Sequence, residues 1–183
     1  MGRKYAIRDQ EKFYFVTFTV IHWMDIFIRE EYRNIFIDSL KYCQKEKGLQ
    51  VGAWCLMTSH AHLIIGTSGT MKLEDIIRDF KSYTSRHIRK AIENNPQESR
   101  KQWLMNAMVK AGIAKSNNRD FQFWQQHNHP IEMNSNEIID SKLEYIHQNP
   151  VAAGFVDEPR DWTYSSARDY GEEKGLIELV FLD

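Results

Sequence analysis

Several features that would place this chain in a specialised class of protein are missing or scarce. The sequence has no uninterrupted run of the 18 or more apolar residues that a membrane-spanning helix needs. The opening MGRKY is not followed by the apolar segment of a signal peptide. Only 2 cysteines occur, Cys43 and Cys55, without the CxxC spacing of a metal or redox motif. We therefore expect a cytoplasmic protein without a membrane span, with both thiols reduced.

The near-neutral charge conceals a division along the chain. Among 183 residues the net charge is −1, yet the segment from Arg78 to Arg119 carries +7 and the segment from Glu132 to Asp183 carries −8. A basic central segment suits a polyanion such as a nucleic acid, because phosphate contacts dominate nucleic-acid binding. The same charges would also be typical of a solvated helix face.

The hydrophobic periodicity predicts one α+β domain over residues 1–183. We expect strands at 13–21, 49–57, 61–66 and within 121–133, and helices at 29–47, 72–92, 98–112 and 136–148. The core order β-α-β-β-α-β predicts a ferredoxin-like (RRM-like) antiparallel sheet, with helices on one face and the first and third strands at its centre. We place an insertion at about 96–119, including a polar loop at 115–119, and a C-terminal helical extension at about 134–183.

The most informative pattern is the pair His60 and His62 inside an apolar strand. Side chains alternate along a strand, so the two imidazoles point to the same face, roughly 6–7 Å apart. At that separation they can hold one divalent metal ion. The alternative is a pair of hydrogen-bonded structural histidines. A second pair, His127 and His129, precedes Pro130.

A second candidate group lies on the long helix predicted at 72–92. Tyr83 and His87 are four residues apart and share a helix face. If that face meets the His60–His62 pair, His87 completes a three-histidine set and Tyr83 presents its hydroxyl to the metal. A phenol is a weak nucleophile at neutral pH, but a strongly polarised phosphate makes its attack feasible. The alternative is a tyrosine and a histidine that merely pack between helix and sheet.

These motifs resemble the HUH family of single-tyrosine transposases, and within it the REP-associated branch. The resemblance spans about residues 13–170 and rests on an ordered series of stretches: MTSHAHLI (57–64), FKSYTS (80–85), FWQ (123–125), YIHQNPVAAG (145–154) and WTYSSA (162–167). A His-x-His pair alone is weakly specific, whereas this ordered set is strongly specific.

The resemblance implies a chemistry and a set of site residues. The histidines of such enzymes bind Mg²⁺ or Mn²⁺, and a tyrosine attacks single-stranded or hairpin DNA to form a 5′-phosphotyrosine, leaving a free 3′-hydroxyl. It implies Tyr83 as nucleophile and His60 and His62 as metal ligands. Relatives often carry Gln or Asn four residues after the tyrosine, so His87 as third ligand is a departure from the family. The step from His129 to Pro130 recurs in relatives, which implies a structural or DNA-facing role for His127 and His129 rather than a second metal site.

Further residues receive roles from their type and position. We expect Tyr42, Trp124 and Tyr145 to lie in the core and His147 to cap or pack a helix end, while Trp103 and Phe123 are candidates for stacking on bases. Basic residues beside Tyr83 are candidates for phosphate contacts: Arg78, Lys81, Arg86, Arg89 and Lys90.

Three other functions stay open at this point. The chain could bind DNA hairpins without cutting them, act as a metal-dependent phosphodiesterase that uses water, or be an α+β domain with structural histidines. A homodimer in which Tyr83 serves the partner's histidines is also compatible with the sequence.

Overall fold

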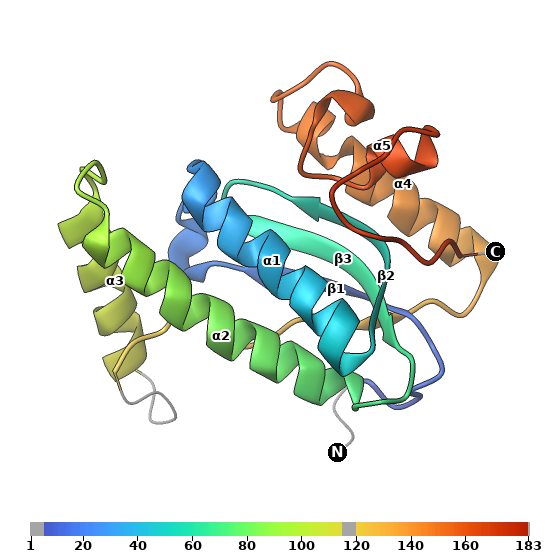
Figure 1. Ribbon diagram of the computed structural model, residues 1–183, viewed down its shortest axis with the longest axis horizontal. Helices are drawn as coiled ribbons and strands as arrows, with labels where there is room; N and C mark the ends of the chain where they lie inside the picture. Colours follow the sequence, from blue (N-terminus) through green and yellow to red (C-terminus); the bar gives the residue numbers. More distant parts are fainter. Residues whose placement is uncertain (1–5, 115–119, 183) are drawn as a thin grey trace.

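The computed structural model describes residues 6–114 and 120–182, and its centre is a four-stranded antiparallel sheet (Figure 1). The strands are β1 (Tyr14–Thr19), β2 (Leu49–Leu56), β3 (His60–Thr67) and β4 (Ile131–Glu132), in the order β2-β3-β1-β4. β1 and β3 are the central pair, with Thr17 opposite His62 and Thr19 opposite His60. This is the ferredoxin-like strand order, so the predicted fold class is confirmed.

Two long helices cover one face of the sheet. Figure 1 shows α1 (Glu30–Lys47) and α2 (Leu73–Asn94) side by side in front of the strands. Each buries a stripe at helical spacing, with Phe36 and Leu40 from α1 and Phe80 and Ile88 from α2 in one core cluster with the strands. Gly48 ends α1 with a left-handed φ of 75°, a conformation that glycine adopts without steric cost.

A third helix lies on the opposite face. α4 (Asn136–Ala152) is capped by Ser135, whose hydroxyl accepts a hydrogen bond from the backbone N–H of Ile138. Its buried Ile146 belongs to a second cluster with Phe15, Ala53 and other strand residues that point away from α1 and α2. The sheet is therefore a layer between two helical layers, and the predicted C-terminal extension forms one of them.

The remaining segments differ in part from the predictions. α3 (Lys101–Ile113) forms as expected within the predicted insertion and packs against α2, whereas residues 115–119 lie outside the described part of the chain. Of the strand predicted within 121–133 only β4 and an isolated bridge from Trp124 to Val20 occur. The helix predicted to end at residue 148 instead continues to Ala152 as α4, and Pro150 lies in its last turn.

The C-terminal part closes over the edge of the sheet. Short helices η2 (Pro159–Asp161) and α5 (Ala167–Tyr170) follow α4, and the backbone of Val180 bonds to Val51 of β2. In the described residues no helix is long and apolar enough to cross a membrane.

Candidate active site

His60 and His62 lie side by side on the sheet face that α4 covers. Their ring centres are 4.8 Å apart, as expected for alternate residues of one strand. The residues between and after them, Ala61 and Leu63, point the other way into the core beneath α1 and α2. The predicted common direction of the two imidazoles is therefore confirmed.

His62 is held in a defined orientation. Its Nδ1 is 3.0 Å from the hydroxyl of Thr17, and its ring stacks on Phe15 with centres 5.6 Å apart. Its Nε2 is buried and has no hydrogen-bond partner among the described residues. Burial, followed by the charges of His60 and Lys142, lowers the pKa of His62 to about 3. A neutral imidazole with one nitrogen fixed by a hydroxyl and the other left open is the form that binds a metal ion.

His60 has a more polar surrounding. Its Nδ1 is 3.2 Å from the hydroxyl of Ser59, and its ring also interacts with the side chain of Asn149 on α4. Burial lowers the pKa of His60, which the Asn149 hydrogen bond and the carboxylate of Asp25 partly offset. His60 is thus also neutral at physiological pH, and the side-chain amide of Asn149 lies beside it.

α4 brings a tyrosine to the histidine pair. The Tyr145 ring lies 5.0 Å from that of His62 and 5.9 Å from that of Phe15, centre to centre. Tyr145 is 47% exposed, so its prediction as a core residue is wrong. One helical turn to either side are Lys142, whose ammonium lies 5.6 Å from the Tyr145 ring, and Asn149. One face of α4 therefore presents a cation, a phenol and an amide to the two imidazoles.

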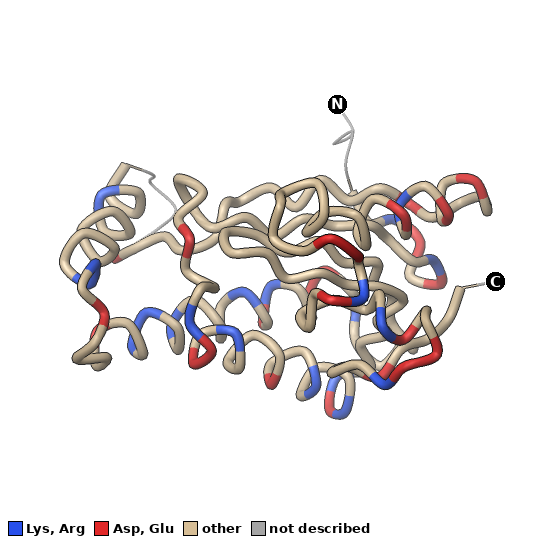
Figure 2. Tube along the Cα trace, turned by 90° about the horizontal axis from the view of Figure 1, so that it is seen from above, with Lys and Arg blue, Asp and Glu red and all other residues tan. Residues whose placement is uncertain are grey.

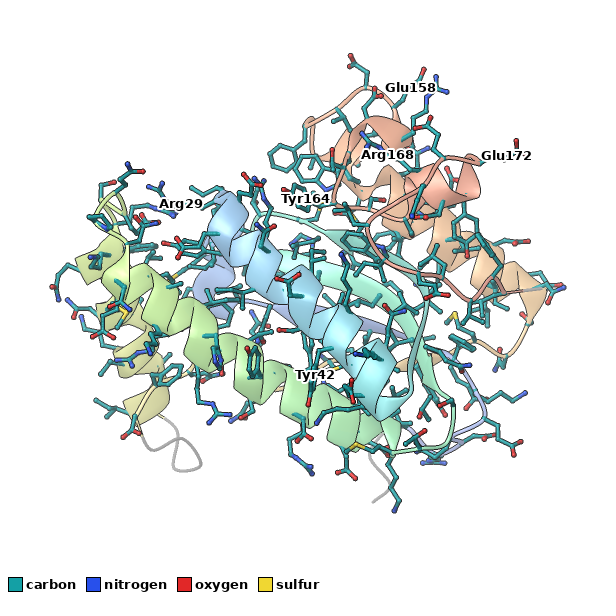
Figure 3. All side chains as sticks on the ribbon, in the orientation of Figure 1. Arg29, Tyr42, Glu158, Tyr164, Arg168 and Glu172 are labelled. Atoms are coloured by element: carbon teal, nitrogen blue, oxygen red, sulfur yellow. The ribbon has the colours of Figure 1, made fainter. Side chains whose placement is uncertain are left out.

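The chain does not bring Tyr83 and His87 to this site. Their rings stack on each other at 3.7 Å, and His87 Nδ1 is 2.9 Å from the Tyr83 carbonyl oxygen. Both line a groove of about 900 Å³ between α1 and α2, on the other side of the sheet from the face that bears the His60–His62 pair. Tyr42, expected in the core, is 58% exposed beside the same groove (Figure 3).

The predicted three-histidine set is wrong for the single chain. Among the described residues, no three His, Cys, Asp or Glu side chains are grouped so that they could hold a metal ion. The reason is the phase of α2. Its buried stripe runs through Phe80, Thr84 and Ile88, which leaves Tyr83 and His87 on the neighbouring stripe that faces α1 and solvent.

The basic residues proposed for DNA contact also belong to α2. Figure 2 shows lysine and arginine positions recurring along the helical layer that contains α2. Lys81 is engaged inside the fold, where its ammonium donates to the Gln125 carbonyl and the Asn128 side chain, both at 2.7 Å, and burial lowers its pKa to about 7. The others have local partners or line the groove: Arg78 pairs with Asp75, Arg89 lies over Phe121, and Arg86 and Lys90 border the groove.

The secondary candidates separate into buried and exposed residues. Trp124 is in the core as predicted, and its indole N–H donates to Thr84. Phe123 is 2% exposed and cannot stack on a base, whereas Trp103 is 57% exposed. His147 packs as predicted, with Nε2 2.9 Å from the Ser166 hydroxyl. His127 and His129 lie near each other, with ring centres 5.9 Å apart.

Sequence reasoning missed Tyr145, Asn149, Lys142 and Thr17. A signal for the first two was present, since Asn149 follows Tyr145 by four residues, which is the spacing often found in the family. Thr17 carries no local signal, because its role depends on the register between β1 and β3.

Comparisons with known proteins agree with this fold. The family of IS200-like transposases matches residues 14–119, more than half of the chain. Among solved structures, a REP-associated tyrosine transposase bound to a REP hairpin superposes with a TM-score of 0.62 at 14% identity, covering 100% of this chain and 94% of that one. A putative transposase from Deinococcus radiodurans gives a TM-score of 0.46 at 16% identity, over 80% of this chain and 94% of that one. The comparison with curated proteins found no significant match. From the family match, this chain belongs to the IS200-like transposases.

Proposed function

We propose that this transposase cleaves and rejoins single-stranded or hairpin DNA at a site formed by His60, His62 and Tyr145. The observation that carries the proposal is the convergence of one exposed phenol and two neutral imidazoles on a single sheet face. The site combines strand β3 with helix α4 of the same chain, which supports catalysis within one subunit.

The residues present fit a divalent metal ion. His62 offers a buried nitrogen without a partner, His60 a second imidazole, and Asn149 an amide oxygen. Imidazole with oxygen donors suits Mn²⁺, and Mg²⁺ is accepted where water and phosphate oxygens complete the shell. A metal ion bound there would withdraw negative charge from a phosphate of the DNA.

The chemical step belongs to Tyr145. Its hydroxyl oxygen attacks the phosphorus, the bond from phosphorus to the 3′ oxygen breaks, and the phenolic proton leaves to solvent while the departing oxygen gains a proton. The products are a 5′-phosphotyrosine and a free 3′-hydroxyl. Attack by a second 3′-hydroxyl reverses the sequence, so rejoining conserves the phosphodiester energy without a nucleotide cofactor. The ammonium of Lys142, 5.6 Å from the Tyr145 ring, supplies positive charge to the phosphate.

The DNA substrate is inferred from the fold. The structural neighbour is bound to a REP hairpin, and its fold superposes on 100% of this chain with a TM-score of 0.62. We therefore take a DNA hairpin with a single-stranded flank as the first substrate to test.

The decisive experiment compares two tyrosines in a covalent-adduct assay. The protein is incubated with end-labelled hairpin DNA carrying single-stranded flanks and with Mn²⁺ or Mg²⁺, then run on a denaturing gel. We expect a protein–DNA adduct that disappears in Tyr145→Phe and persists in Tyr83→Phe. Tyr83 is a matched control because both phenols are 47% exposed and both lie on helices that pack against the sheet.

Each other outcome identifies another function. Loss of the adduct in Tyr83→Phe alone would contradict our assignment and indicate that α2 acts on a partner's histidines in a dimer. Cleavage without any adduct would indicate a phosphodiesterase that uses water. Hairpin binding on a native gel, with neither cleavage nor adduct, would indicate a binding protein that has lost catalysis.

A further inference from the structure

The short helix that follows β1 carries an unusual backbone. In η1 (Ile21–Trp23) the two residues His22 and Trp23 both have a φ of 53°, in the left-handed region that non-glycine residues rarely occupy. Such conformations raise the free energy of the fold and persist only where the surroundings impose them. Here hydrogen bonds from Phe27 N–H to the Thr58 carbonyl and from Val20 N–H to the Ser59 carbonyl tie the segment to the turn that precedes His60.

The consequence of this backbone is an outward-facing tryptophan. The neighbours Ile21 and Met24 are 4% and 3% exposed, whereas Trp23 is 57% exposed. Most of a large apolar ring is thus held in water between two core residues. An exposed large aromatic side chain on a strained segment is a candidate for contact with a ligand.

Trp23 also lies next to the candidate active site. Its ring centre is 5.1 Å from that of His60, with the planes at 70°. Two residues further along, the Asp25 carboxylate accepts a hydrogen bond from Thr58 and acts electrostatically on His60. A tryptophan ring offers a flat apolar face, so the ligand that fits over Trp23 is an uncharged planar group.

We propose that Trp23 stacks on one nucleobase of the DNA strand, next to the phosphate held beside His60 and His62. The inference rests on the proposed function for the location of the strand. Stacking between a base and an aromatic side chain is sequence-tolerant and contributes about tenfold or more in affinity. Trp23 would position the single strand and fix which phosphate enters the site, with no part in proton transfer.

An abasic scan tests the proposal without any cleavage. Hairpin DNAs with single-stranded flanks are prepared with one base removed at each flank position in turn, and their dissociation constants are measured by fluorescence anisotropy in EDTA. For the unaltered protein we expect one position, or two adjacent ones, at which base removal weakens binding about tenfold. Trp23→Ala should weaken binding of the intact DNA to the same degree. In that variant, removal of the base at the sensitive position should cause no further loss of affinity. Trp23→Phe should retain most of the affinity.

Phe181→Ala is the control, because Phe181 has a similar exposed fraction of 55% and lies in the C-terminal segment, to which no DNA contact is assigned. A 5-iodouracil placed at the sensitive position should also photo-cross-link to Trp23 in the unaltered protein. Three results would each overturn the proposal. Trp23→Ala could bind the DNA as tightly as the unaltered protein does, or its loss of affinity could add to that from base removal at every position of the flanks. The cross-link could also form to Trp103 instead of Trp23. Since none of these measurements needs a covalent adduct, an inactive Tyr145 would leave this result standing.

Discussion

The ring of Tyr145 meets the imidazole of His62 edge to face, at 5.0 Å between centres and 68° between planes. The contact joins a strand from the first half of the chain to a helix from its last third. It is fixed by the next residue, Ile146, which is fully buried against the sheet. Helix packing therefore sets the distance between the proposed nucleophile and the proposed metal ligands.

Replacing Thr17 with valine should weaken metal binding. The substitution keeps the side-chain shape and removes the hydroxyl 3.0 Å from His62 Nδ1. Loss of a partner that orients a ligating histidine typically costs 10–100-fold in metal affinity. Titration with Mn²⁺ followed by electron paramagnetic resonance measures the effect. Thr67→Val on the same sheet is the control, since it removes a hydrogen bond to the Met71 carbonyl at the far end of β3. Equal affinities of Thr17→Val and the unaltered protein would exclude the role of Thr17.

Much of this arrangement was predictable from local patterns, and the failures have one physical cause. Strand alternation placed His60 and His62 on one face, and helical spacing located α2 and α4. Neither pattern states which face of a sheet a helix will cover. On α2 the structure buries Thr84 completely, while its neighbour Tyr83 remains 47% exposed.

The same limitation concealed Tyr145. Its helix carries an apolar stripe that includes Ile146, and adjacent residues on a helix point about 100° apart, so a small error in phase exchanges core and surface. Only the packing of α4 on the second face of the sheet decides that Ile146 turns inward and that Tyr145 reaches the histidines.

Lys142→Met should weaken DNA binding and reduce its dependence on salt. Methionine keeps the length of the side chain, which lies with its ammonium 4.9 Å from the Phe15 ring beside the site, and removes the charge. Each phosphate that a protein cation neutralises contributes roughly 0.9 to the slope of log affinity against log salt, or about 0.7 for a single strand. We expect the slope to fall by about one such increment in anisotropy titrations between low and moderate salt. The control is Lys41→Met, because Lys41 is exposed on α1 in the other helical layer, and this variant should leave the slope unchanged. An unchanged slope in Lys142→Met would contradict a phosphate contact.

Acid should remove a stabilising contribution from Glu98. Its carboxylate is 3% exposed and lies 2.8 Å from Arg29 and 3.0 Å from Arg100. Burial alone would raise the pKa of Glu98, but hydrogen bonds from Arg100 and Arg29 outweigh it and lower the pKa to about 2. Because the folded-state pKa lies below the unfolded value, the contribution is complete above about pH 4.5 and disappears as pH falls towards 2.

Urea unfolding of Glu98→Gln at several pH values checks this expectation. Near pH 7 the variant should be less stable by about 2–3 kcal/mol, and the difference from the unaltered protein should shrink continuously below about pH 4.5. Comparison at equal pH cancels the titration of all other carboxylates. Glu93→Gln on the exposed face of α2 should show no such trend. A difference that stays constant with pH would mean that the two arginines do not stabilise the ionised form.

Substitutions of Asn149 should either lower or raise the affinity for the metal ion. The Asn149 side chain interacts with His60, one helical turn beyond Tyr145, so its amide oxygen is placed to be the third donor beside the two imidazoles. Asn149→Ala removes that oxygen and should weaken Mn²⁺ binding by tenfold or more. Asn149→Asp is nearly identical in shape and adds a negative charge, so it should bind Mn²⁺ more tightly than the unaltered protein.

Calorimetric titration of the two Asn149 variants tests Asn149 as a metal donor. A carboxylate at this position would bind a cation more strongly than an amide does, so weaker binding by both variants would exclude residue 149 as a ligand position. Gln148→Ala, the neighbouring residue of α4, is the matched control and should bind as the unaltered protein does. Opposite shifts in Asn149→Ala and Asn149→Asp, together with an unchanged Gln148→Ala, would support an oxygen donor from α4 beside the metal and so place the metal and the tyrosine next to one helix.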